Sequence, residues 1–379
     1  MLNIEKIKSI PTPFYYYNLE LLKQTIEVLK KESEKYNYHI HYALKANTNN
    51  EILKIIMDAG LGADCVSGNE VKKAKQENFK KIFFAGVGKT DEDINHALDY
   101  NIDCFNCESL QEIEVLNELA LLKNKIAPIA FRINPNVNAN THKYITTGLE
   151  ENKFGINIWE LENVVKKTQQ LKNIKITGIH FHIGSQITDL SAFKSLCLRV
   201  NEIQNWFSTH KITLEHINVG GGLGVDYHQP DINPIANFSE YFSTFNQFLE
   251  LQPHQTLHFE IGRAIVAQCG TLISKVLYVK NGISTNFAIL DAGMTELIRP
   301  ALYQSYHKIE NIISKKPPVK YDVVGPICES SDCFGKAVML PETKRGDIIA
   351  IRTTGAYGEV MSSQYNLRSK AKAVYSTQL

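Results

Sequence analysis

The chain has 379 residues, a length that suits one large domain with a smaller one rather than a single small core. Its 41 Lys and Arg residues nearly balance its 40 Asp and Glu residues, so charge favours neither nucleic acid nor an anionic membrane as a partner. The first ten residues mix Glu5, Lys6 and Lys8 with apolar residues, unlike a secretion signal. All apolar runs are shorter than the roughly 20 residues that span a bilayer. These features predict a cytoplasmic protein that binds small molecules.

The cysteines are scattered along the chain, and without a secretion signal they are expected to be free thiols. Cys104 and Cys107 form a C-x-x-C pair around Phe105 in a strand-like run. No second cysteine pair lies nearby, so a buried strand is favoured over the alternative of a redox or metal site. We therefore expect no metal.

Short apolar strands alternate with longer amphipathic helices through the first two thirds of the chain. A helix is expected over 18–36, where apolar residues recur at helical spacing. The expected strands are 39–44, 63–66, 82–85, 104–105, 128–133, 176–183, 216–219 and 257–261. The expected helices between them are 51–59, 70–76, 91–98, 110–121, 158–171, 190–207 and 238–249. This alternation predicts a closed (β/α)8 TIM barrel, with a doubly wound open sheet as the alternative.

After Arg263 the pattern changes to strand-like runs separated by turns, with little helix. These runs are 271–279, 286–290, 321–324, 337–340 and 347–352, and an exposed loop is expected at 315–318. The predicted organisation is a barrel domain over residues 18–265. Residues 266–379, together with the N-terminal residues 1–17, are predicted to form a mostly antiparallel β domain.

Polar residues and glycines fall at the carboxyl ends of six of the eight expected strands. They are Lys45, Asp64 with Ser67, Arg132, His182 with Ser185, Gly220 to Gly222, and Glu260 to Arg263. In (β/α)8 barrels the catalytic groups lie at this end, because the loops that follow the strands converge there. We therefore expect these residues to form one site.

Two of these features suggest an aldehyde-bearing phosphate ligand. Lys45 lies among apolar residues, and a desolvated lysine forms imines readily; a solvated lysine at a strand end is the alternative. The glycines after the seventh strand, with Gly262 after the eighth, lie where barrels bind phosphate on backbone amides. A tight turn is the alternative for the glycines.

The histidines of the sixth strand and Glu260 suggest a flat, basic ring. His180 and His182 alternate along the strand and so face the barrel interior together, where an imidazole can stack on a cofactor. A hydrogen-bonded core histidine is the alternative. Glu260 lies in an apolar run and needs a partner, either a protonated pyridine nitrogen or a buried salt bridge to Arg132.

These residues resemble the fold type III PLP-dependent decarboxylases, the alanine racemase-like barrel family, over almost the whole chain. The shared motifs follow the family order. They are Y-A-L-K-A-N at 42–47, D-C-V-S-G at 64–68, R-I-N-P at 132–135, K-F-G at 153–155, H-F-H-I-G-S-Q at 180–186, G-G-G at 220–222, E-I-G-R at 260–263, R-P-A-L-Y at 299–303, G-P-I-C-E-S-S-D at 325–332 and G-A-Y-G at 355–358. Ile261 stands where the family often has proline, and the segment from Tyr365 departs from the common Asn-Ser-Arg pattern. The second departure puts the end of the β domain in question, not the site.

The resemblance implies that Lys45 carries pyridoxal 5'-phosphate (PLP) as a Schiff base, that His182 stacks on its ring and that Glu260 pairs with the pyridine nitrogen. It further implies a cofactor site completed, mainly around the phosphate, by Asp64, Ser185, Gly221, Gly222, Gly262, Arg263 and Tyr357. It also implies a head-to-tail homodimer with shared active sites. Cys328 and Glu329 would serve the other subunit's cofactor, with Cys328 as the proton donor.

The same resemblance implies decarboxylation of meso-2,6-diaminopimelate to L-lysine and CO2, the last step of lysine biosynthesis. The substrate-binding residues would be Arg263 and Arg299, with Tyr303, toward the distal carboxylate, and Glu329 toward the distal ammonium. Tyr357 would also contact the substrate. A surface salt bridge is the alternative for Arg299. Rival functions are a decarboxylase of carboxynorspermidine, ornithine or arginine, a racemase of the same fold, a non-catalytic PLP carrier and an inactive regulatory homologue.

Overall fold

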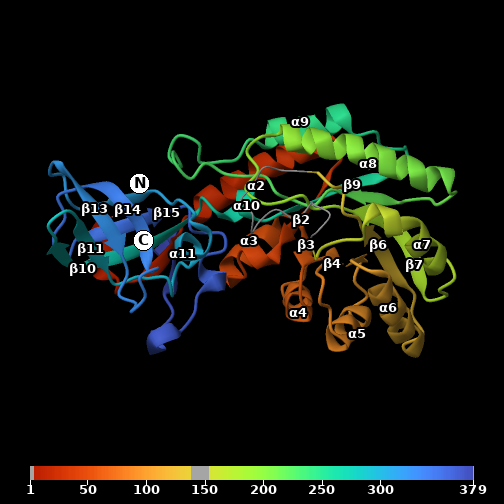
Figure 1. Ribbon diagram of the computed structural model, residues 1–379, viewed down its shortest axis with the longest axis horizontal. Coiled ribbons are helices and arrows are strands. Elements are labelled where there is room, and N and C mark those ends of the chain that lie inside the picture. Colours follow the sequence, from red (N-terminus) through yellow and green to blue (C-terminus); the bar gives the residue numbers. More distant parts are fainter. Residues whose placement is uncertain (1–3, 138–152, 379) are drawn as a thin grey trace. The chain divides into compact units, whose positions relative to one another are not determined.

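The structure, a computed structural model, describes residues 4–137 and 153–378 and folds into two compact units (Figure 1). The barrel unit comprises Ile26–Gly224 and Asn237–Gly262, and the β unit comprises Met1–Thr25, Val225–Ala236 and Arg263–Leu379. The segment 225–236 thus belongs to the β unit although it follows a barrel strand. The loop at 141–152 lies outside the described residues. In the described part of the chain, no helix combines the length and apolar character that a membrane span needs.

Eight parallel strands close into a barrel, which confirms the predicted barrel and excludes the open sheet. They are β2 (His39–Ala43), β3 (Gly62–Cys65), β4 (Ile82–Phe84), β5 (Cys104–Cys107), β6 (Ala127–Arg132), β7 (Ile174–His180), β8 (His216–Asn218) and β9 (Thr256–Ile261). Each strand pairs with its neighbour in sequence, and β2 closes the ring by pairing with β9. The carboxyl ends of all eight strands therefore lie at one rim.

The helices lie outside the strands, and α3, α4, α5, α6 and α9 begin after a side chain that accepts a hydrogen bond from a free backbone N–H group. They are α2 (Leu19–Glu34), α3 (Asn50–Asp58), α4 (Gly68–Gln76), α5 (Asp91–Asp99), α6 (Leu110–Leu122), α7 (Ile158–Thr168), α8 (Ser191–Thr209) and α9 (Phe238–Phe248). Figure 1 shows α4, α5 and α6 in succession and α8 beside α9. The Ser67 hydroxyl caps α4 by accepting from the Glu70 N–H, and Ser109 caps α6 in the same way.

Histidines from three strands form a buried layer inside the barrel. His41 Nε2 lies 2.8 Å from His258 Nδ1, and the His216 and His258 ring centroids are 5.2 Å apart. Burial lowers the pKa of His41 to about 3 and that of His216 to about 4, so both rings are neutral near pH 7. Glycines make room for them, because a Cβ on Gly62 would lie 2.3 Å from His41 Nδ1.

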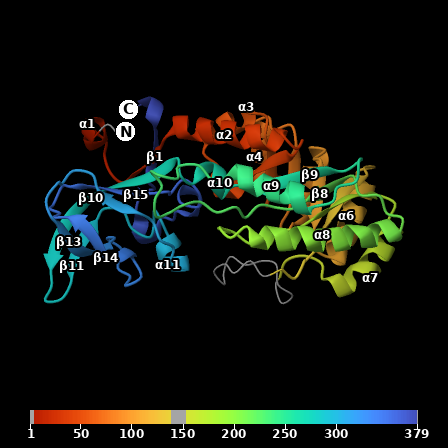
Figure 2. The ribbon, with the colours of Figure 1, turned by 90° about the horizontal axis from the view of Figure 1, so that it is seen from above.

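The β unit contains a mostly antiparallel sheet, as predicted, and the described sheet has eight strands. Its strands are β1 (Phe14–Tyr17), β10 (Gly270–Asn281), β11 (Asn286–Leu290), β12 (Ile309–Asn311), β13 (Pro318–Val324), β14 (Cys333–Pro341), β15 (Ile348–Arg352) and β16 (Lys372–Tyr375). Figure 2 labels β10, β11, β13, β14 and β15 among them. Their order is β12-β15-β10-β11-β13-β14, and β1 pairs with β10 and β16. Among the described pairs of this sheet, β11–β13 and β1–β16 are parallel and the others are antiparallel. Phe14, Ile273 and Ile348 form part of its apolar core.

Several short elements were not expected from the sequence. They are β1, β12 and β16, the helices α1 (Ile4–Ser9), α10 (Arg263–Val266) and α11 (Arg299–Tyr303), and the 3-10 turns η1 (Leu44–Ala46), η2 (Glu359–Met361), η3 (Tyr365–Leu367) and η4 (Ser376–Gln378). Each has six residues or fewer, too few to repeat a helical or strand period. Three of them, η1, α10 and α11, carry residues of the candidate site.

Candidate active site

Lys45 lies at the carboxyl rim of the barrel, in the turn η1 directly after β2. Its Nζ lies 3.9 Å from Oδ2 of Asp64 on β3. Asp64 is 1% exposed, and neither of its carboxylate oxygens has a hydrogen-bond partner within residues 4–137 and 153–378. Burial raises the pKa of Asp64, the charge of Glu260 raises it further, and the Lys45 ammonium opposes the rise.

The amine itself is less buried than the sequence indicated. The Lys45 side chain is 40% exposed, so the expectation of a desolvated lysine is wrong for this structure. The turn η1 carries Lys45 past the end of β2, whereas its neighbours Leu44 and Ala46 are fully buried. The buried partner of the pair is Asp64.

Glu260 on β9 lies inside the barrel and is hydrogen-bonded to three neutral side chains. Asn106 Nδ2 and Asn218 Nδ2 donate to Oε1 at 3.1 Å and 2.8 Å, and His180 Nε2 lies 2.9 Å from Oε2. Burial raises the pKa of Glu260, and the ammonium of Lys45 is the strongest opposing influence. The four residues come from β5, β7, β8 and β9, so barrel closure brings them together.

Arg132 does not pair with Glu260, and that predicted salt bridge is wrong. The Arg132 guanidinium donates instead to Glu108 Oε1 at 2.5 Å. Glu108 Oε2 accepts from the Gly155 N–H at 2.8 Å, and the Phe154 ring centroid lies 4.8 Å from the guanidinium carbon. Arg132 and Glu108 together therefore hold residues 154 and 155 beside the ends of β5 and β6.

His182 follows β7 and contacts the glycine segment after β8. Its Nδ1 accepts from the Gly221 N–H at 3.4 Å, and burial lowers its pKa well below the usual value. Gly220 and Gly222 have φ of +68° and +107°, and a Cβ on Gly221 would lie 1.9 Å from the Glu260 carbonyl oxygen. Close backbone packing thus explains these glycines by itself, and phosphate binding stays a prediction.

Two further residues of the predicted phosphate site lie on neighbouring loops of the barrel unit. Ser185 is partly buried on the loop after β7. A Cβ on Gly262 would lie 2.9 Å from that of Ala46, so glycine is needed where β9 ends beside η1. Both positions lie at the carboxyl rim.

The β unit holds two buried guanidinium groups around tyrosine rings. Arg263 Nη1 donates to the Tyr227 hydroxyl at 2.6 Å, and its guanidinium carbon lies 4.9 Å from the Tyr357 ring centroid. The guanidinium carbon of Arg299 lies 5.6 Å from the Tyr303 centroid and 5.8 Å from that of Tyr357. The structure therefore brings the four predicted residues together and adds Tyr227, which no motif indicated.

Arg299 is a buried cation with no carboxylate partner in the part of the chain that the structure describes. It is 6% exposed, forms no ion pair with any acid in the described residues, and its Nε has no hydrogen-bond partner there. Burial lowers its pKa. A buried, uncompensated charge is costly, so the surface salt bridge is excluded and an anionic ligand is the natural partner.

Cys328 and Glu329 lie exposed at the tip of the loop before β14. Tyr365 donates its hydroxyl to Glu329 Oε1 at 2.8 Å. The buried Asp332 carboxylate shapes the loop by accepting from the Ile327 N–H at 2.7 Å. The predicted roles of Cys328 and Glu329 toward a second subunit stay predictions.

The C-x-x-C pair lies inside the barrel wall. Cys104 and Cys107 are buried in β5, and burial raises the pKa of the Cys104 thiol to about 12, which disfavours the thiolate that redox or metal chemistry needs. No group of three His, Cys, Asp or Glu side chains suited to a metal occurs among the described residues.

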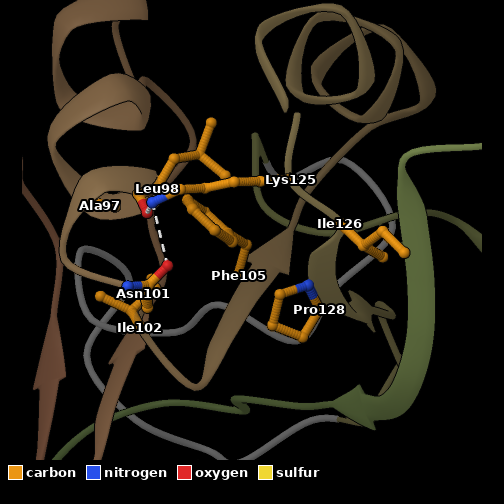
Figure 3. Close-up of a pocket in the computed structure, with 8 residues that line it drawn as sticks. All are labelled: Ala97, Leu98, Asn101, Ile102, Phe105, Lys125, Ile126 and Pro128. Carbon is orange, nitrogen blue, oxygen red and sulfur yellow. Dashed lines mark hydrogen bonds between the residues drawn. The ribbon is translucent and has the colours of Figure 1, made fainter. Parts of the chain in front are cut away.

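A hollow of about 180 Å³ opens on the opposite rim of the barrel (Figure 3). It is lined by Ala97, Leu98, Asn101, Ile102, Phe105, Lys125, Ile126 and Pro128. Lys125 Nζ already donates to the Leu98 carbonyl and to Asn101 Oδ1. Because these residues lie toward the amino ends of β5 and β6, the hollow is separate from the Lys45 site.

A (β/α)8 barrel with a lysine at its carboxyl rim and a buried acid inside is shared with a known class of proteins. The family described as "Pyridoxal-dependent decarboxylase, pyridoxal binding domain" matches residues 19–267, so the chain belongs to the pyridoxal-dependent decarboxylases. Solved structures of more distant members show the same fold. The lysine/ornithine decarboxylase of Vibrio vulnificus, complexed with putrescine, has a TM-score of 0.86 at 20% identity, covering 99% of this chain and 97% of that one.

Closer relatives identify the branch. The diaminopimelate decarboxylase of Bacteroides thetaiotaomicron is 56% identical, and the match covers 99% of this chain and 98% of the relative. The crystal structure of diaminopimelate decarboxylase from Helicobacter pylori complexed with L-lysine has a TM-score of 0.93 at 38% identity, covering 99% of this chain and 94% of that one. Within its class, the chain belongs to the diaminopimelate decarboxylase family.

Proposed function

We propose that this chain decarboxylates meso-2,6-diaminopimelate to L-lysine and CO2, with PLP held by Lys45, as the last step of lysine biosynthesis in the cytoplasm. One observation carries the proposal: Lys45, the buried acids Asp64 and Glu260, and the buried Arg263 and Arg299 all occur in a chain 56% identical to a diaminopimelate decarboxylase. The arginines favour a substrate with a second carboxylate.

The barrel residues fit the cofactor chemically. An amine is needed for its aldehyde, and Lys45 supplies one at the rim. Glu260, hydrogen-bonded to neutral donors, has no cation paired with it among the described residues and suits a protonated ring nitrogen. His182 would lie against the ring face. Ser185, Gly221, Gly222, Gly262, Arg263 and Tyr357 would hold the phosphate.

When bound, PLP supplies the electron sink that stabilises the negative charge left on the substrate α carbon as CO2 departs. The Lys45 Nζ would hold PLP covalently until the substrate amine binds. An ionised Glu260 would keep the ring nitrogen protonated. Cys328 would return a proton from Sγ to the α carbon. Arg299 and Glu329 bind the distal carboxylate and ammonium, which fixes the orientation of the bond that breaks.

Substrate choice tests the proposed function directly. We expect CO2 release from meso-diaminopimelate at a kcat/KM at least about 100-fold above that for L-lysine, L-ornithine, L-arginine or carboxynorspermidine. Substrates without the distal carboxylate leave a buried guanidinium without its anion, and so lose transition-state binding. The measurement is CO2 release from each compound by the purified protein supplied with PLP. Preference for ornithine or arginine would assign a sister decarboxylase, and racemisation without CO2 release would assign a racemase.

We further propose that two chains form a head-to-tail homodimer with shared active sites. Cys328 and Glu329 are exposed at a loop tip. The family resemblance gives both residues roles at an active site, and a second chain would supply that site. The inactive variants Cys328→Ala and Lys45→Ala should recover up to about a quarter of wild-type activity when mixed and allowed to exchange subunits. Heterodimers would then hold one intact site. Each variant mixed with itself is the control. Proven exchange without recovery would contradict shared sites.

A further inference from the structure

Three side chains bind the Glu260 carboxylate, those of Asn106, His180 and Asn218. His180 is the imidazole among them, and no motif gave it a role of its own. It lies on β7, is 1% exposed, and its Nε2 is 2.9 Å from Glu260 Oε2. Asn106 and Asn218 both bind the other carboxylate oxygen, Oε1. Oε2 therefore has His180 as its one side-chain donor among the described residues.

The surroundings decide which ring nitrogen of His180 carries the proton. Nδ1 is buried and has no hydrogen-bond partner within residues 4–137 and 153–378. A proton on Nδ1 would bury an unsatisfied N–H and would also turn the Nε2 lone pair toward a carboxylate. A proton on Nε2 avoids both costs. Burial, with the charge of Arg132, lowers the pKa of His180 well below its usual value, so the ring is neutral and donates from Nε2.

We propose that His180 is a positioning residue that keeps Glu260 ionised and oriented by donating its Nε2–H to Oε2. This inference rests on the proposed function, in which the ionised Glu260 holds the ring nitrogen of PLP in its protonated form. A neutral donor is suited to the task. A permanent cation in its place would neutralise the carboxylate and compete with the ring nitrogen for it.

Burial works against the ionised state, which is why a donor matters here. Burial raises the pKa of Glu260, and the hydrogen bonds from the two asparagines lower it. A hydrogen bond to a charged group stabilises it by roughly 1.5 kcal/mol, which corresponds to about one pKa unit. The other charged groups that act on this pair are Lys45, Asp64, Lys89, Glu108 and Arg132. Replacing His180 leaves all five of these charged side chains in the protein.

The test is the pH dependence of the holoenzyme in His180→Leu, with His180→Gln as the variant that keeps a donor. In H180L the acidic limb of the kcat profile should move to higher pH by about one unit while the high-pH plateau is kept. The acid-side change in the visible absorption of bound PLP should move with it. H180Q should keep both near the wild-type position. His216→Leu removes another buried histidine of the barrel interior that does not contact Glu260, and should move neither.

An unmoved limb in H180L, or an equal shift in H180Q or H216L, would overturn the inference. If H180L does not fold, His180→Ala takes its place, with added imidazole expected to restore the limb. The proposed function fails separately, because wild-type protein would then release no CO2 from meso-diaminopimelate. The absorption titration would still report on His180 in that case.

Discussion

Lys45→Ala is expected to reduce CO2 release from meso-diaminopimelate by at least about a thousandfold, because the proposed covalent link to the cofactor would be lost. The chain has other lysines, among them the buried Lys89, but Lys89 Nζ is bound to Glu112 Oε1 at 2.6 Å and to two backbone carbonyls. Lys45 is the lysine of the barrel rim that lies beside a buried carboxylate otherwise without hydrogen bonds in the described structure. Borohydride reduction followed by peptide mass analysis should therefore place PLP on Lys45 in the wild type.

The matched control is Lys175→Ala, which removes a lysine exposed on the barrel surface and paired with Glu215 at 2.7 Å. Such a pair contributes little to stability, and the variant should keep full activity and full labelling of Lys45. Lys45→Ala should fold normally, since the wild-type side chain is 40% exposed. A folded Lys45→Ala protein that still decarboxylates at the wild-type rate would refute the assignment of the cofactor lysine.

The order of strands and helices along the barrel unit was predictable, because its strands are apolar runs of suitable length between amphipathic helices. Closure was predictable from their number. Elements shorter than one structural period were not, and β1 illustrates why. Phe14–Tyr17 is four aromatic residues with no alternation, and its place in the sheet is fixed by pairing with β10 and with β16 at the other end of the sequence. Long-range pairing of this kind leaves no local signal.

The position of a candidate residue was predictable where it stands at a strand end, as Lys45, Asp64 and Glu260 do. The partners of Glu260 were not. From the sequence, Arg132 was the expected cationic partner of Glu260. In the folded barrel, Asn106 and Asn218 bind the Glu260 carboxylate instead, and Arg132 pairs with Glu108. Asparagine inside an apolar strand is itself a signal, since a buried amide needs partners. Asn106 and Asn218 are both fully buried and could have been singled out on that ground.

Arg299→Met is expected to separate activity from stability. The guanidinium is 6% exposed, has no acidic partner in the described residues, and has a lowered pKa because of burial. Methionine has a similar length without the charge, so the free energy of unfolding should stay unchanged or rise by about 1 kcal/mol. The kcat/KM for meso-diaminopimelate should fall by at least about 100-fold, because the distal carboxylate loses a charge-assisted hydrogen bond and its counterion. Denaturant unfolding and steady-state kinetics on the same preparation measure the two effects.

The control for the charge itself is Arg345→Met in the same unit. Arg345 is exposed, its guanidinium carbon lies 4.9 Å from the Tyr278 ring centroid, and it donates to the Leu277 carbonyl. It shares the cation–aromatic contact of Arg299 but not its burial, so its loss should leave kcat/KM unchanged. A structural role for Arg299 predicts the reverse pattern in the first variant: stability lost by several kcal/mol and kcat/KM retained in the folded fraction. The two interpretations of the buried arginine therefore differ in the sign of the stability change, which makes unfolding the decisive measurement.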